Sequence, residues 1–177
     1  FSCIRTMGHI YKSRGNFDLS AQYYQEALDY MLKNMPDQDP SQLYSSLAEY
    51  YRNTQKDYAT ALDYCEKALK SAKTERNIAQ AMIEKCLVLF RQGRIDEFND
   101  CYKEAVQMAD RCKLSASVSL LIAHISKNIL DKQYEQAHAH ADQLSEKGLQ
   151  QHAYIYECAK DYPNAIKYLK KYHQQLD

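Results

Sequence analysis

The chain has 177 residues, of which 45% are hydrophobic and 26% are charged, the composition of an ordinary globular protein. Lysine and arginine together number 23, as do aspartate and glutamate, and this zero net charge argues against direct contact with nucleic acid or an anionic membrane. No apolar run approaches the roughly 18 residues that a transmembrane helix needs. Only four glycines and three prolines are present, which favours helices joined by tight turns.

Two amphipathic helices are expected at the start of the chain, over about residues 2–13 and 19–33. Their apolar residues recur at the i, i+3, i+4, i+7 spacing that places them on one helix face. These residues are Ile4, Met7, Gly8 and Tyr11 in the first helix and Ala21, Tyr24, Ala27, Leu28 and Met31 in the second. Gly15 supplies the turn between the two helices. The segment therefore predicts a helical hairpin whose two helices cross closely at Gly8.

The same two-helix pattern returns along the rest of the chain. In the second copy we expect Asp39 to cap a helix, with Pro40 as its first residue and Gln42 as the reciprocal partner. The turn of this copy, at residues 53–57, is one residue longer than that of the first. We therefore expect a single domain of five repeats, at about residues 1–35, 40–73, 77–112, 114–146 and 148–177. Because Phe1 already lies in a helical pattern without an initiator methionine, we expect a fragment of a longer chain.

This pattern resembles the tetratricopeptide repeat, and the first copy carries the resemblance most fully. The matching residues are Ile4, Met7, Gly8, Tyr11, Gly15, Phe17, Ser20, Tyr24 and Ala27. Later copies depart from the family pattern, with Lys85 in place of a leucine and Asn128 in place of an aromatic residue. The resemblance implies an all-α solenoid of about five helix-turn-helix hairpins in a right-handed superhelix. It also implies a non-catalytic domain that binds a peptide or a protein segment.

Three of the four repeat intervals are longer than the usual tetratricopeptide period of about 34 residues. The intervals are 41, 37, 39 and 28 residues between the small or apolar positions Ser20, Ala61, Phe98, Ala137 and Ala165. Repeats of this length resemble those of the peptide-pheromone-responsive regulators of Gram-positive bacteria. That weaker resemblance implies the sensory or scaffolding part of a larger, transcription-regulatory protein.

In the tetratricopeptide family the first helix of each repeat lines a concave groove, so its positions outside the core are candidates for peptide binding. These candidates are Arg5, His9, Lys12, Glu49, Arg52, Asn53, Ile83 and Leu87. Arg5 and Arg52 are suited to an acidic or carboxylate end of a peptide, and Asn53 to its backbone. Alternatively, Arg5, Lys12 and Arg52 are solvated surface charges, and the apolar candidates belong to the core.

Residues that bind metals or catalyse reactions are not clustered in the sequence. His138 and His140 are two residues apart and so face different sides of a helix, while His124, His152 and His173 have no cysteine or carboxylate at ligand spacing. The six cysteines form no CxxC pair and are typical of reduced core thiols in a cytoplasmic protein. We therefore expect no enzymatic activity, no metal and no cofactor.

Two other functions fit the same fold. The chain is alternatively an oligomerisation or assembly scaffold that forms a homodimer through its convex face or through a C-terminal helix at about residues 163–176. The apolar stripe of that helix consists of Ile166, Leu169, Tyr172 and Leu176. A third alternative is a regulatory module of an enzyme whose catalytic domain lies upstream.

Overall fold

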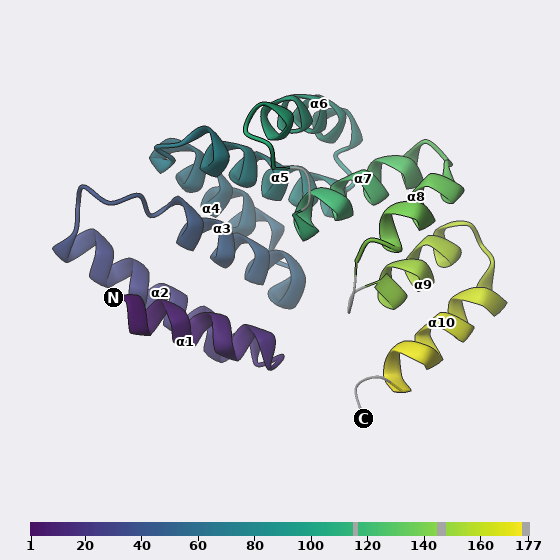
Figure 1. Ribbon diagram of the computed structural model, residues 1–177, viewed down its shortest axis with the longest axis horizontal. Coiled ribbons are helices and arrows are strands. Elements are labelled where there is room, and N and C mark those ends of the chain that lie inside the picture. Colours follow the sequence, from purple (N-terminus) through teal and green to yellow (C-terminus); the bar gives the residue numbers. More distant parts are fainter. Residues whose placement is uncertain (115–116, 145–147, 175–177) are drawn as a thin grey trace. The chain divides into compact units, whose positions relative to one another are not determined.

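The structure is a computed structural model that describes residues 1–114, 117–144 and 148–174. All regular secondary structure in these ranges is helical, as expected (Figure 1). The chain divides into two compact parts, an N-terminal unit at Phe1–Leu114 and a C-terminal unit at Ser115–Asp177. No helix within the described ranges is long and apolar enough to cross a bilayer.

The N-terminal unit consists of three helical hairpins. Its helices are α1 (Ser2–Ser13), α2 (Phe17–Asn34), α3 (Ser41–Tyr50), α4 (Tyr58–Ser71), α5 (Glu75–Gln92) and α6 (Ile95–Arg111). A π-helical turn, η1 (Tyr51–Gln55), continues directly from α3. Successive hairpins contact one another through α2 with α3 and α4 with α5, and α3 also contacts α5. The first helices of successive hairpins therefore lie near one another.

The C-terminal unit consists of two hairpins built on the same plan. They are formed by α7 (Val118–Leu130) with α8 (Tyr134–Ala141), and by α9 (Gly148–Cys158) with α10 (Tyr162–Gln174). The two hairpins contact each other through α8 and α9. Residues 145–147 and 175–177, which include Leu176 of the expected apolar stripe, lie outside the described residues.

Side-chain caps fix where several helices begin. In each case a side-chain oxygen accepts a hydrogen bond from the backbone N–H three residues later, which satisfies a donor that the first helical turn leaves unpaired. The capping residues are Asn16, Asp57, Thr74 and Ser117. Gly15 and Gly93 have φ values of +74° and +72°, the left-handed conformation that ends a helix at little cost for glycine. The predicted turn at Gly15 is thus confirmed.

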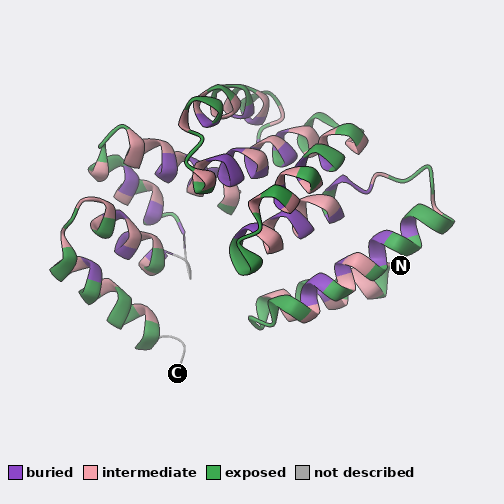
Figure 2. Ribbon diagram, turned by 180° about the vertical axis from the view of Figure 1, so that it is seen from behind, coloured by how far each residue is buried: buried purple, intermediate pink, exposed green. Residues whose placement is uncertain are grey.

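The core runs along the facing sides of the hairpin helices, where small side chains recur (Figure 2). Gly8 shows why one of these positions must be small, because a Cβ atom there would lie 2.6 Å from Cε1 of Tyr24. The Ser20 hydroxyl donates to the Gly8 carbonyl at 2.8 Å and ties α2 to α1 at the same crossing. The absence of a side chain at Gly8, where the two helices are predicted to cross closely, therefore leaves room for the Tyr24 ring.

Several predicted boundaries need correction. Helix α3 begins at Ser41 with Pro40 as its N-cap residue, and Asp39 accepts a hydrogen bond from the Ser41 N–H at 2.9 Å. Asp39 therefore caps this helix from one residue further out than expected. The extra residue expected in the second turn lies instead in η1, because a π-helical turn holds more residues than an α-helical turn.

Candidate functional site

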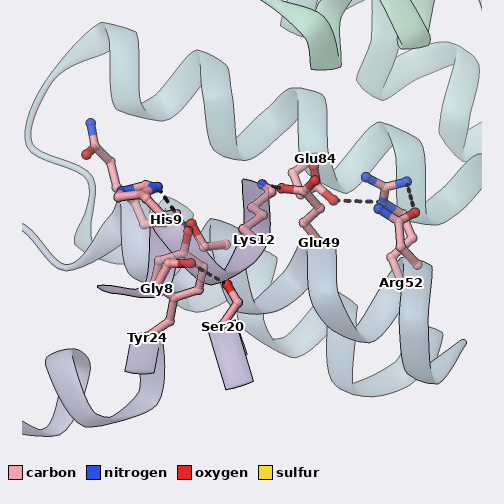
Figure 3. A network of polar contacts seen from close by, with 11 residues as sticks. Gly8, His9, Lys12, Ser20, Tyr24, Glu49, Arg52 and Glu84 are labelled. Atoms are coloured by element: carbon pink, nitrogen blue, oxygen red, sulfur yellow. Dashed lines mark hydrogen bonds and ion pairs between the residues drawn. The ribbon is translucent and has the colours of Figure 1, made fainter. Parts of the chain in front are cut away.

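Four charged side chains from successive hairpins form a row on the first helices of the N-terminal unit (Figure 3). Lys12 of α1 donates a hydrogen bond from Nζ to Oε2 of Glu49 on α3. Arg52 of η1 donates from Nε to Oε1 of Glu84 on α5 at 2.7 Å. The carboxylates of Glu49 and Glu84 lie between the two cations of this charged row, and each neutralises one of them.

The two ion pairs of the charged row differ in burial. The side chains of Arg52 and Glu84 are each 5% exposed, whereas those of Lys12 and Glu49 are 35% and 22% exposed. Burial lowers the pKa of Arg52, but the Glu84 carboxylate outweighs this effect and raises it. Burial raises the pKa of Glu84, and the adjacent guanidinium opposes that rise. Because arginine stays charged in proteins, the Glu84 carboxylate is its counter-ion.

Arg52 does not occupy the open groove position expected for an anion partner. Its Nε is bound to Glu84, and a second guanidinium nitrogen donates to Oδ1 of Asn53 at 2.8 Å. A solvated surface charge, the alternative interpretation, does not describe it either. Arg52 is instead a buried structural charge that connects η1 to α5.

The apolar candidates also lie in the core. Ile83 and Leu87 are 0% and 2% exposed, because α5 packs against α3, α4 and α6. The alternative interpretation of the apolar stretch as core is therefore the correct one for these two residues. A ligand could reach them only if the surrounding helices separated.

His9 is exposed, and its ring contacts a residue of the core. Its Nδ1 lies 3.0 Å from the hydroxyl of Tyr24, and the two rings meet edge to face. Burial lowers the pKa of His9, and the nearby charges of Arg5 and Lys12 lower it further. The imidazole is therefore neutral at pH 7, and the Tyr24 hydroxyl fixes its orientation.

Asn53 is exposed at the other end of the charged row. Because its Oδ1 accepts a hydrogen bond from Arg52, the amide is oriented with Nδ2 as its remaining donor group. Arg5 is half-buried, and its guanidinium carbon lies 5.8 Å from the centroid of the Phe1 ring, within cation–π range. Of the two arginines expected to bind an anion, Arg5 alone retains part of its side chain at the surface.

A histidine cluster in the C-terminal unit was not anticipated from the sequence. His152 has Asp142, ten residues earlier in the chain, as a carboxylate partner at 3.0 Å, and its Nδ1 lies 2.7 Å from Nδ1 of His138. His140 stacks on His124 instead, which confirms that His138 and His140 face different sides of α8. Within the described ranges, no group of three or more potential ligand side chains is placed to hold a metal ion.

Comparison with known proteins identifies the repeats. Residues 2–74 match the family model described as tetratricopeptide repeat. This match supports a tetratricopeptide repeat family for residues 2–74. Tetratricopeptide repeats are a non-catalytic fold that generally mediates protein–protein interaction or scaffolding. The matched tetratricopeptide repeats comprise α1 to α4, and thus the helices that present His9 and Asn53.

A solved structure extends the likeness of fold over the whole chain. The crystal structure of BtubC (BKLC) from P. vanneervenii aligns with a TM-score of 0.58, and covers 97% of this chain and 77% of that chain. The two sequences are 17% identical, so the likeness is one of fold alone. None of the curated proteins compared with this chain matches it. The fold is an all-α, tetratricopeptide-like solenoid of helical hairpins, whose superhelical hand stays a prediction.

Proposed function

We propose that this chain is a non-catalytic domain that binds a peptide or an extended segment of a partner protein along the first helices of its N-terminal unit. One observation carries the proposal. Exposed His9 and Asn53 are each held in a fixed orientation by a hydrogen bond to a residue of the core. Both lie within the tetratricopeptide repeat part of the chain.

Fixed polar groups suit the recognition of an extended backbone. Such a backbone presents peptide N–H and carbonyl groups that lose water on binding and need new partners. The amide of Asn53 and the imidazole of His9 supply such partners without being ordered first, and this pre-organisation lowers the cost of binding. Between them, Lys12 and Glu49 present a partly exposed, neutral ion pair. We therefore expect recognition of backbone and polar side chains, with Arg5 as the candidate for an acidic or carboxylate end.

The proposal extends to the larger protein. The lengthened repeats support a sensory or scaffolding role in a transcription-regulatory protein, and the six cysteines, none of which forms a disulfide, support a cytoplasmic location. A regulatory module of an enzyme would bind its target through the same surface. The upstream sequence separates the two, since it encodes a DNA-binding domain in the first case and a catalytic domain in the second.

A random peptide library selected on the chain tests the proposal. Peptides that bind the wild-type chain are compared with the double variant His9→Ala/Asn53→Ala by calorimetry. Loss of two hydrogen bonds of roughly 1 kcal/mol each predicts a weakening of about tenfold or more. The matched control Gln22→Ala/Gln107→Ala alters two exposed residues on α2 and α6, and should leave affinity unchanged. Equal loss in both double variants, or in neither, would contradict the proposed surface.

An assembly role is the second candidate, favoured by exposed apolar side chains on α10. Tyr162, Ile166 and Leu169 are all exposed on this helix. A second copy of the chain would bury them, because exposed apolar surface of this kind marks interaction sites. Light scattering should then detect a concentration-dependent dimer that Leu169→Lys abolishes. A monomer at all concentrations would remove this candidate.

A further inference from the structure

The C-terminal unit has a pocket of about 370 Å³ that the family comparison does not explain. Helices α8, α9 and α10 contribute its lining. The polar and aromatic residues that line it are Glu135, His138, Asp142, His152, Tyr156 and Tyr168. None of them belongs to the charged row of the N-terminal unit.

Four of these side chains form a continuous aromatic wall. The His138 ring centroid lies 4.4 Å from that of Tyr156 and 4.9 Å from that of His152. Tyr168 closes the set, with its centroid 5.0 Å from His152 and 5.4 Å from Tyr156. Contacts on several sides hold the rings in place, so the wall is ready for a flat group to stack on it.

With both histidines neutral, hydrogen bonds determine which of their ring nitrogens carry protons. The Asp142 carboxylate can only accept, so Nε2 of His152 donates to it over 3.0 Å. If both rings are neutral, Nδ1 of His152 is then an acceptor, and Nδ1 of His138 donates to it over 2.7 Å. His138 is therefore left with an unprotonated Nε2. Burial and the neighbouring His152 lower the pKa of His138, so this neutral state holds at pH 7.

The pocket consequently offers acceptors and ring faces, with tyrosine hydroxyls as the only rotatable donors among the lining groups named. The carboxylates of Glu135 and Asp142 are exposed at its edge and make it unfavourable for anions. One aromatic ring already attracts a cation, since Nζ of Lys171 lies 5.2 Å from the centroid of Tyr168. These groups suit a ligand that carries a positive charge and donates hydrogen bonds.

We propose that this pocket binds the guanidinium group of an arginine side chain from a partner protein. A guanidinium has five N–H donors and no acceptor, which complements a pocket edged by carboxylates and an unprotonated imidazole nitrogen. It is also planar and stacks on aromatic faces, whereas the lysine ammonium is compact and strongly hydrated. The proposal does not depend on binding at the N-terminal unit, because the two sites share no residue.

Nuclear magnetic resonance of the full 177-residue chain tests the proposal directly. The ring C–H signals of His138 and His152 are followed during titration with N-acetyl-arginine amide. The same titration is repeated with the lysine amide and with the citrulline amide, which has the shape of arginine without its charge. We expect saturable shifts with arginine, binding at least about fivefold weaker with lysine, and no saturation with citrulline. Equal binding of lysine or citrulline, or no saturation with arginine, would overturn the proposal.

A matched pair of variants tests whether the arginine probe binds in this pocket. Glu135→Gln removes one charge from the pocket edge, and should weaken arginine binding about two- to fivefold, the range for an exposed ion pair. Glu157→Gln makes the same change at an exposed residue of α9 outside the pocket lining, and should leave binding unchanged. If both variants bind the arginine probe equally well, the pocket does not bind the guanidinium.

Discussion

Nε of Arg52 lies 2.7 Å from Oε1 of Glu84, and both side chains are only 5% exposed. The pair connects the π-helical turn after α3 to α5, and so joins the second and third hairpins. A residue that appears in sequence to be a candidate for binding a peptide therefore stabilises the fold. Because substituting Arg52 destabilises the fold, a lower affinity in such a variant would not show that Arg52 contacts a ligand.

Substituting Arg52 or Glu84 alone should lower the free energy of unfolding more than substituting both. Arg52→Met and Glu84→Gln each leave the other charge buried without its counter-ion, which costs about 3–5 kcal/mol of unfolding free energy. The double variant Arg52→Met/Glu84→Leu should lose much less, because two apolar side chains replace the pair. Urea unfolding measures the free energy of unfolding of the two single variants and the double variant. The exposed pair Lys67 and Asp63 is the control, and its loss should cost less than about 1 kcal/mol.

Gly8→Ala should destabilise the chain even though Gly8 lies within a helix. Alanine is favoured over glycine in a helix by about 1 kcal/mol. Here the new Cβ would lie 2.6 Å from the buried ring of Tyr24, and overpacking of this kind costs about 1–3 kcal/mol. In a Tyr24→Leu background the same substitution should be better tolerated. If Gly8→Ala were as stable as wild type, the Tyr24 ring would have to move away from the new Cβ at little energetic cost.

Asp39 should contribute to stability in a pH-dependent way. Its carboxylate accepts from the backbone N–H groups of Ser41 and Lys73 and from the side chain of Asn77, at 2.8–2.9 Å. Burial raises the pKa of Asp39, but these hydrogen bonds outweigh burial and lower it. A lowered pKa stabilises the fold above the unfolded value of about 3.9, and the contribution is lost as pH falls through the folded value.

Asp39→Ala should therefore cost about 1–2 kcal/mol at pH 7, and the difference from wild type should shrink below about pH 4. Thermal unfolding across this pH range measures the effect. Asp37→Ala, in the same loop, is the control, and should cost less at every pH. A cost for Asp39→Ala that stays constant down to pH 2 would contradict the role of its carboxylate.

Arginine binding in the C-terminal pocket should weaken as pH falls. Burial lowers the pKa of His138 below its usual value, so binding should persist at pH 7 and be lost as pH falls through that lowered pKa. Protonation converts an acceptor into a donor and places a positive charge against the guanidinium. The other charged or titratable groups around the two rings are Glu135, Asp142, Tyr156, Tyr168 and Lys171.

Carboxyl, phenol and amine groups of these types titrate outside pH 5–7.5 in peptides, so a loss of binding in that range reports the imidazoles. His138→Asn keeps a polar side chain but cannot become charged, and should flatten the pH dependence of arginine binding. The affinity of N-acetyl-arginine amide for the two chains is measured between pH 7.5 and pH 5. An equally steep pH dependence in His138→Asn would exclude His138 as the titrating group.

The hairpins could be predicted from sequence because their signals are local. The apolar spacing of residues 2–33 and the turn at Gly15 correspond to α1, α2 and the glycine turn between them. The start of α3 was misplaced by one residue because Asp39 binds groups 34 and 38 residues away as well as the helix itself. A capping pattern alone does not reveal such distant partners.

The candidate site was less predictable because it depends on partners from different hairpins. Arg52 and Glu84 are 32 residues apart, and Arg52 lies in a π-helical turn whose winding changes the direction of successive side chains. His138 and His152 are 14 residues apart on different helices. No spacing rule for one helix would bring either pair together. That His9 and Asn53 lie outside the core could be predicted, because their positions follow the repeat.

Affinity of a library-selected peptide for the wild-type chain and for His9→Ala/Asn53→Ala tests the central proposal most directly. Both substituted side chains are exposed, but each loses a hydrogen bond to a core residue, so the urea unfolding of the double variant is measured beside its affinity. The account predicts binding that is weaker by about tenfold or more, with the Gln22→Ala/Gln107→Ala control unchanged. Wild-type affinity in His9→Ala/Asn53→Ala would show that this surface does not bind the peptide.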